Sequence, residues 1–248
     1  MLSPYYQQHA DYVSISREQG CRFAKLVADD FNPLHDKDAK KFCVPGDLLF
    51  SLVLNRYGIS EKMEFTFAGM VDENSKLTFP EGADEFAITD GEKVMLKVKR
   101  EGAVSQCPEL TNSLIKNYVE FSGTTFPHVI IPLMGKQDVM INPARPMVIY
   151  ESMLINLDRL DISAPELEFA EPDFEFTGKR GKITLRFNLL ENGEKVGAGE
   201  KHMLVSGIRD YCQTTVADLI SFYNNRKESL KPAESLQLRQ MAITETFF

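Results

Sequence analysis

The polar turn Asp30-Phe31-Asn32-Pro33-Leu34-His35 separates two helical patterns near the start of the chain. Pro33 has no amide hydrogen and cannot continue a helix, so the segments on either side must be distinct elements. Asp and Asn are common turn residues, and in one interpretation they merely cap those helices. The turn also gathers Asp30, Asn32 and His35 in one short stretch. A carboxylate, an amide and an imidazole so close together favour acid–base chemistry.

The segment before the turn has the pattern of an amphipathic helix. Ser16-Arg17-Glu18-Gln19 forms a capping box, in which Ser16 and Gln19 satisfy free amides at the helix start. We expect this helix to run to about Ala28. After the turn, a short helix is expected from about Lys37 to Phe42, with Asp36 as its cap.

Pro45-Gly46-Asp47 opens a segment of a different character, because Leu48 to Leu54 is apolar almost all round. A helix of this kind is enclosed on most of its sides. It ends near Gly58, which can supply a left-handed terminus. Beyond it the period changes to two, which predicts antiparallel strands. The alternating apolar residues are Met63, Phe65 and Phe67, then Leu77 and Phe79, then Val94, Leu96 and Val98.

The second half of the chain repeats this order. We expect a helix at about Leu110–Phe121, an irregular loop at Ser122–His128, an apolar helix from about Pro146 to Leu160, and strands to about Ile208. Its final hairpin turn, Asn192-Gly193-Glu194-Lys195-Val196, corresponds to Asp90-Gly91-Glu92-Lys93-Val94 in the first half. This correspondence favours an internal duplication.

These patterns predict an α+β protein whose halves pair their antiparallel sheets edge to edge, with both long helices inside the curve. The expected units are residues 1–104 and 105–230, followed by a polar tail at 231–248. A closing helix is expected around Val216–Tyr223. In the alignment of the halves, Thr124 stands opposite Asp30 and Val129 opposite His35, so the second half lacks the polar residues of the turn.

The turn and its flanking helices resemble the hydratase motif of the MaoC-like, (R)-specific enoyl-CoA hydratase family. The turn matches that motif without a gap, and Asp38 and Phe42 also fall where the family commonly has such residues. The motif covers Phe23 to Leu52, and the order of elements extends the resemblance more weakly to most of the chain. The resemblance implies a double hot-dog fold, in which each of two fused units wraps a sheet around a long buried helix, with one working site.

The resemblance also implies roles for individual residues. Asp30 and His35 would be the acid/base pair that adds water to an α,β-unsaturated thioester, and Gly46 would donate its amide to the developing enolate. Asn32 would orient the pair or the water, and Ser51 would lie near the substrate. The implied partner is an acyl thioester of coenzyme A or of acyl carrier protein. No additional cofactor and no metal site are expected.

The sequence departs from this family at the start of the buried helix. Related hydratases usually have His-Gly-Met there, whereas this chain has Pro45-Gly46-Asp47. Pro45 removes one donor, and Asp47 opposes the reaction if it faces the site. Two alternatives therefore stay open. One is a non-catalytic hot-dog module that binds an acyl group or a partner protein, and the other is an acyl thioesterase.

Composition narrows the class of protein. With 248 residues, 43% hydrophobic and 26% charged, the chain is expected to be globular, and its formal charge of −8 disfavours nucleic acid as a partner. We find no export signal and no apolar run long enough to cross a membrane. The cysteines lie far apart, which is typical of reduced thiols in the cytoplasm: Cys21, Cys43, Cys107 and Cys212. Pairing of two chains as a homodimer stays open.

Overall fold

The computed structural model describes residues 2–144 and 147–245, and it describes side chains as far as residue 230. Its helices are η1 (Ser3–Tyr5), α1 (Arg17–Leu26), η2 (Pro33–His35), α2 (Gly46–Tyr57), α3 (Pro108–Gly123), α4 (Thr125–His128), α5 (Ile130–Gly135) and α6 (Gln213–Glu245). Its strands are β1 (Gln7–Gln8), β2 (Val13–Ser14), β3 (Ile59–Phe67), β4 (Leu77–Thr78), β5 (Glu85–Asp90), β6 (Lys93–Ser105), β7 (Val139–Met140), β8 (Met147–Leu157), β9 (Glu166–Phe169), β10 (Asp173–Thr177), β11 (Arg180–Glu191), β12 (Glu194–Ser206) and β13 (Arg209–Asp210). The expected combination of helices with an antiparallel sheet is confirmed.

Within the described residues, the large sheet has 11 strands, of which ten follow the order β1-β2-β4-β5-β6-β3-β8-β12-β11-β10 while β9 pairs with β11. Every pairing in it is antiparallel. At its centre β3 pairs with β8, from Lys62 opposite Asn156 to Thr66 opposite Ser152. Read from the edge toward the centre, the order is therefore β5-β6-β3 on one side and β11-β12-β8 on the other.

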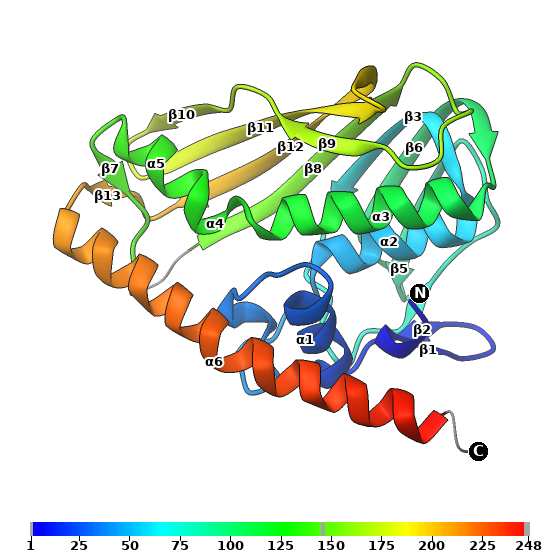
Figure 1. The fold of residues 1–248 in the computed structure, drawn as a ribbon, viewed down its shortest axis with the longest axis horizontal. Coiled ribbons are helices and arrows are strands. Elements are labelled where there is room, and N and C mark those ends of the chain that lie inside the picture. The colour runs from blue at the N-terminus through cyan, green and yellow to red at the C-terminus, as the bar shows by residue number, and fades with distance from the viewer. Residues whose placement is uncertain (1, 145–146, 246–248) are drawn as a thin grey trace.

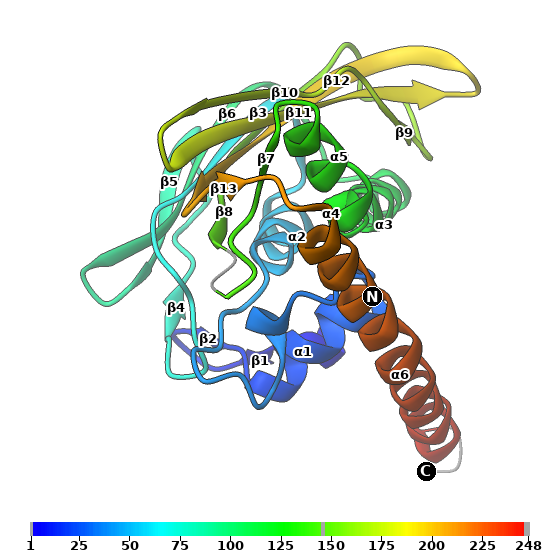
Figure 2. The ribbon, with the colours of Figure 1, turned by 90° about the vertical axis from the view of Figure 1, so that its left-hand side faces the viewer.

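The sheet curves over α2 and α3, which lie side by side beneath it (Figures 1 and 2). All residues of α2 from Asp47 to Leu54 are buried, as its apolar sequence predicts, and α3 buries a continuous face. Phe50 of α2 contacts Tyr118 of α3, and Tyr118 contacts Phe187 of β11, at ring-centroid separations of 4.7 and 5.8 Å. One hydrophobic core therefore spans both halves.

The two hairpin turns that correspond in sequence join equivalent strands. Asp90-Gly91 connects β5 to β6, and Asn192-Gly193 connects β11 to β12. Gly91, Asn192 and Gly193 have φ angles of 58°, 53° and 81°. Tight hairpins require this left-handed backbone, and Gly and Asn adopt it at little cost.

The expected helix from Pro146 to Leu160 is wrong. Pro146 lies outside the described residues, and Met147–Leu157 is the central strand β8, which pairs with both β3 and β12. A central strand can be apolar over much of its length, and such a run resembles a buried helix in sequence. Within it, Met153, Ile155 and Leu157 are buried at alternate positions, which is the spacing of a strand.

Three other expectations also differ from the structure. The short helix from Lys37 to Phe42 does not form, because the helical turn comes earlier, as η2, and Asp36 ends it in extended backbone. The irregular loop Ser122–His128 contains the end of α3 and the helical turn α4. The segment beyond residue 230, expected as a polar tail, continues α6 as far as Glu245.

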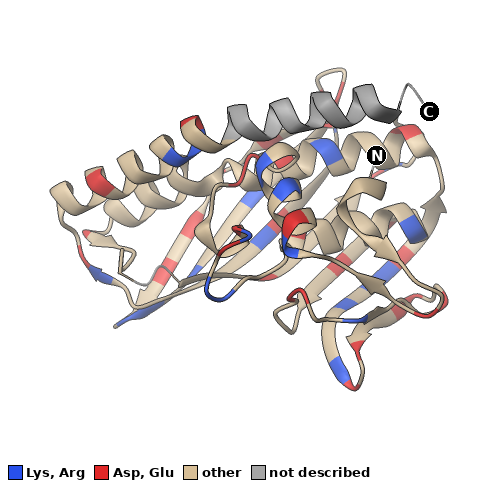
Figure 3. Cartoon of the chain, turned by 90° about the horizontal axis from the view of Figure 1, so that it is seen from below, with Lys and Arg blue, Asp and Glu red and all other residues tan. Residues whose placement is uncertain are grey.

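Charged residues of both signs are interspersed over the helices and strands that are coloured in Figure 3. Over the described part of the chain, no helix combines the length and the apolarity that crossing a bilayer requires.

Candidate active site

The polar turn brings Asp30 and His35 together. The side-chain oxygen of Asn32 accepts a hydrogen bond from the amide of Leu34 (3.1 Å), and Asp30 Oδ1 accepts one from the amide of Asn32 (2.8 Å). These bonds fix the turn and leave Asp30 Oδ2 facing His35 Nε2 at 3.5 Å. Asn32 therefore shapes the turn rather than projecting its side-chain oxygen away from it.

The orientation of His35 follows from one hydrogen bond. Its Nδ1 lies 2.7 Å from the carbonyl oxygen of Cys43, and because a carbonyl can only accept, Nδ1 carries a proton. Nε2 is thus the nitrogen that can exchange a proton next to Asp30. The side chains of His35 and Asp30 are 12% and 24% exposed, so a water molecule beside them can contact both.

The buried residue Lys25 of α1, which was not among the predicted site residues, stabilises the polar turn. Lys25 is 1% exposed, and its ammonium donates to the carbonyl oxygens of Asp30 (2.9 Å) and Asn32 (3.3 Å). It also pairs with Asp36 Oδ1 at 3.2 Å. The only signal in the sequence was its place beside apolar residues near the end of α1.

Helix α6, which packs against α1, also contacts the polar turn and its flanking residues (Figure 1). The hydroxyl of Tyr223 accepts from the amide of Phe31 and donates to the carbonyl of Asp29, each at 3.4 Å. Arg226 pairs with Asp36, and Lys227 pairs with Asp29. Burial raises the pKa of Tyr223, so its hydroxyl keeps its proton at neutral pH.

Gly46 is the first residue of α2, where the amides at the start of a helix have no partner within the helix. A Cβ at this position would lie 3.1 Å from ring atoms of both Phe67 and Tyr150. Those rings pack together beside Gly46, with centroids 4.3 Å apart. Ser51, expected near the substrate, is fully buried and donates its hydroxyl to the carbonyl of Asp47 within α2 at 2.7 Å.

Asp47 points into the protein rather than into solvent. Its side chain is buried, and Oδ2 accepts a hydrogen bond from Ser122 of α3 at 2.6 Å. Lys201 of β12 in turn donates to the oxygen of Ser122. Burial raises the pKa of Asp47, while the nearby Lys201 charge opposes this rise. The charges of Asp30 and His35 also act on this carboxyl, so the pair and Asp47 share one electrostatic environment.

Two tyrosines complete a buried polar cluster, made of Asp47, Ser122, Lys201, Tyr118 and Tyr150. The hydroxyls of Tyr118 and Tyr150 are hydrogen-bonded, and the ammonium of Lys201 lies 4.1 Å from the centre of the Tyr150 ring. Burial raises the pKa of both tyrosines well above the usual value. No local sequence pattern reveals this cluster, because its members come from four elements, and β8, which carries Tyr150, was expected to be helical.

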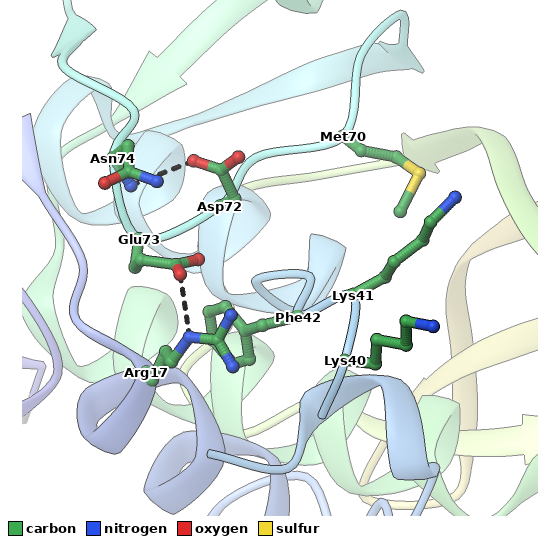
Figure 4. A pocket seen from close by; sticks show the side chains of 8 residues that line it. All are labelled: Arg17, Lys40, Lys41, Phe42, Met70, Asp72, Glu73 and Asn74. Carbon is green, nitrogen blue, oxygen red and sulfur yellow. Dashed lines mark hydrogen bonds and ion pairs between the residues drawn. The ribbon is translucent and has the colours of Figure 1, made fainter. Parts of the chain in front are cut away.

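Asp30 and His35 line neither of two surface hollows. One has a volume of about 310 Å³, and it contains the Arg17–Glu73 ion pair (2.7 Å) and the extended side chains of Lys40 and Lys41 (Figure 4). The other, of about 260 Å³, lies over β8, β11 and β12. Gly46 lines neither of them. Among the described residues, no group of His, Cys, Asp and Glu is arranged to hold a metal ion.

Comparisons with solved structures found distant likenesses. The tesB protein MAP1729c of Mycobacterium avium subs paratuberculosis is 9% identical, with a TM-score of 0.39 over 66% of this chain and 87% of that one. A conserved protein of unknown function with a hot dog fold from Alicyclobacillus acidocaldarius is 7% identical, with a TM-score of 0.42 over 83% and 97%. A MaoC-like dehydratase is 12% identical, with a TM-score of 0.39 over 83% and 99%.

A search of curated proteins found no significant match. The family described as "Protein of unknown function (DUF3581)" matches residues 1–214, which include the polar turn, α2, α3 and the whole large sheet. The chain therefore belongs to the DUF3581 family.

Proposed function

We propose that this protein is an enoyl-thioester hydratase that adds water to an α,β-unsaturated acyl group carried by coenzyme A or acyl carrier protein. The observation that carries the proposal is the Asp30–His35 pair, whose Oδ2 and Nε2 atoms face each other at 3.5 Å. A carboxylate and an imidazole in this arrangement can divide the two proton transfers that hydration requires.

In the proposed reaction, a water molecule held by the pair adds through its oxygen to the β-carbon. The pair accepts one proton from that water and delivers a proton to the α-carbon. The hydrogen bond from His35 Nδ1 to Cys43 keeps Nε2 directed at the reaction, and Lys25 keeps the backbone of the turn in place. The amide of Gly46 would donate to the thioester oxygen as negative charge develops there.

The arrangement of Asp47 supports this proposal despite the departure from the family pattern. A free carboxylate beside a developing enolate would oppose the reaction through charge repulsion. Here Asp47 is hydrogen-bonded to Ser122, and the positive charge of Lys201 lies on the other side of that serine. This opposite charge reduces the repulsion that Asp47 would exert on the enolate.

We propose the double hot-dog fold together with this function, with units at residues 1–104 and 105–230. Three features support this fold: the mirrored strand orders of the two halves, the one long enclosed helix in each half, and the matching hairpin turns. We propose a cytoplasmic protein, because the wide spacing of its four cysteines is typical of reduced thiols. Whether two chains pair as a homodimer bears on neither proposal.

One observation favours a second candidate, the non-catalytic module. The rings of Phe67 and Tyr150 fill the space beside Gly46, where the thioester would approach. In a hydratase these rings must move when substrate binds. In a module that only binds an acyl group or a partner protein, they can stay in place.

Hydration of a short enoyl-CoA such as crotonyl-CoA, followed by the loss of absorbance of the conjugated double bond, tests the proposal. We expect Asp30→Asn and His35→Ala each to lower kcat/KM by about 10²–10⁴-fold, because each removes one proton-transferring group. Asp11→Asn is the matched control, since Asp11 is an exposed carboxylate outside the motif and should leave the rate unchanged.

Equal rates for the wild type, Asp30→Asn and His35→Ala would refute the hydratase. If those proteins still bind a saturated acyl-CoA with equal affinity, the module explains the result. Release of free thiol from the saturated acyl-CoA would instead indicate a thioesterase.

A further inference from the structure

We propose that Ser122, Asp47 and Lys201 form a second catalytic centre, in which Ser122 is a nucleophile that accepts the acyl group of an activated ester or thioester. The inference rests on the proposed function only for the class of ligand, an acyl thioester. It adds a different reaction, hydrolysis through an acyl-serine, to a site formed by other side chains.

The direction of the hydrogen bonds defines the state of Ser122. An ammonium has only donors, so Lys201 must donate to Ser122 Oγ. The Ser122 hydroxyl then donates to Asp47 Oδ2 at 2.6 Å. The proton of Ser122 is therefore already directed at a base, and a positive charge lies against its oxygen. This is the arrangement that activates a serine nucleophile.

Asp47 also has an oxygen available for a further donor. Its Oδ1 atom is buried and has no hydrogen-bond partner among the residues whose side chains the structure describes. A buried carboxylate that served stability alone would be expected to have both oxygens satisfied, because an unsatisfied buried acceptor is destabilising. A water molecule donating to Oδ1 would be held beside Ser122, where the second half of a hydrolysis requires it.

The centre lies where an acyl group bound near Asp30 would reach. Ser122 is in the last turn of α3, and the next residue, Gly123, packs so closely that a Cβ there would lie 1.6 Å from the carbonyl oxygen of Ala28 and 3.3 Å from the amide of Asp30. On its other side, Asp47 follows Gly46 at the start of α2. The amides there can stabilise the oxyanion of a tetrahedral intermediate.

The reaction balances without a further reagent. Ser122 Oγ attacks the carbonyl carbon of the thioester, and its proton passes to Asp47 Oδ2. The carbon–sulfur bond then breaks, and the leaving thiolate takes that proton from Asp47, which gives a free thiol and an ester on Ser122. Water attacks this ester with Asp47 as the base, the proton returns to Ser122 Oγ, and the carboxylic acid is released. Lys201 takes no part in these proton transfers.

Access to the centre passes through Tyr150. Ser122, Asp47 and Lys201 are 4%, 7% and 5% exposed, whereas Tyr150, which lies against Lys201, is only half-buried. The ring of Tyr150 must turn away before a thioester carbonyl can reach Ser122. A small, reactive acyl donor is therefore the first probe to use.

Peptide mass spectrometry after incubation of the full-length wild type with p-nitrophenyl acetate, and separately with acetyl-CoA, tests the proposal. We expect up to one acetyl group per chain, located on Ser122. Treatment with hydroxylamine should remove it, because an ester on serine is labile and an amide on lysine is not. Ser60→Ala is the matched control, since Ser60 is a fully buried serine of β3 that accepts a hydrogen bond from Arg100, lies outside the centre and should not affect labelling. Ser122→Ala should abolish it.

Wild-type labelling does not depend on any variant folding, so the proposal stays testable if Ser122→Ala is unstable. Failure to acetylate Ser122, or acetylation only as a hydroxylamine-stable lysine amide, overturns it and leaves the cluster as a structural hydrogen-bond network. Labelling should persist in Asp30→Asn, which impairs the proposed hydration. The two proposals can therefore fail separately.

Discussion

At the scale of single residues, the surroundings of each polar group decide its chemistry. The cysteines illustrate this, because two of them differ widely in acidity. Burial raises the pKa of the Cys43 thiol to about 11, with the charge of Asp72 adding to the effect. Hydrogen bonds from Thr214 and Thr215 lower the pKa of exposed Cys212 to about 7. Both residues are expected to be reduced thiols, yet only Cys212 has surroundings that favour the reactive thiolate.

We therefore expect iodoacetamide to alkylate Cys212 at neutral pH, with a rate that rises with pH and reaches half its plateau near pH 7. Cys43 should stay unmodified in the folded protein until the pH approaches 11. Peptide mass spectrometry over a series of pH values measures both, and Cys212→Ser identifies the fast-reacting site. Equal rates at the two cysteines would contradict the assignment.

At the scale of elements, the polar turn depends on a helix that is distant in sequence. Helix α6 contacts Asp29 and Asp36, which flank the polar turn, through Tyr223, Arg226 and Lys227. Lys25 of α1 donates a hydrogen bond to the carbonyl oxygen of Asp30 within the turn. These contacts fix the backbone that presents Asp30 and His35. Helix α6 is consequently part of the support of the candidate site.

We expect Arg226→Met to lower the free energy of unfolding by about 1.5–3 kcal/mol, because it removes a largely buried, charge-assisted hydrogen bond to Asp36. Urea denaturation measures this loss. The matched control is Lys62→Met, which removes a pair whose side chains are 61% and 74% exposed and should cost less than about 1 kcal/mol. Equal losses in the two variants would show that α6 does not stabilise the turn.

At the scale of the whole molecule, the two halves share one sheet and one core. Strands β3 and β8 pair at the centre, and Phe50, Tyr118 and Phe187 pack across the boundary between residues 104 and 105. A smaller cluster around α5, β10 and the start of α6 forms a separate core. The halves can therefore be equivalent in topology without being independent in stability.

We expect the amides of β6 and β12 to exchange with solvent hydrogen at the same free energy, because neither half can open without exposing the shared core. Hydrogen exchange followed by mass spectrometry at several urea concentrations measures this. The edge strand β10 should exchange earlier and serves as the internal reference. A lower opening energy for β6 alone would show that residues 1–104 unfold as a separate unit.

Local patterns were sufficient to predict much of this protein. The capping box at Ser16 and Gln19 is confirmed, as are the enclosed helix α2 and the turn that brings Asp30 next to His35. In each case the controlling forces act between residues close in sequence. Proline geometry, helix capping and the period of apolar residues are all of this kind.

Only the tertiary structure decided the remainder. The apolar run Met147–Leu157 is a strand because β3 and β12 supply its hydrogen bonds on both edges. Asp47 turns inward because Ser122 and Lys201 meet it in the core. Ser122 lies 75 residues after Asp47 in the sequence, and Lys201 lies a further 79 residues after Ser122. A buried charge is tolerated only where a partner is present, and the sequence near Asp47 contains no sign of one.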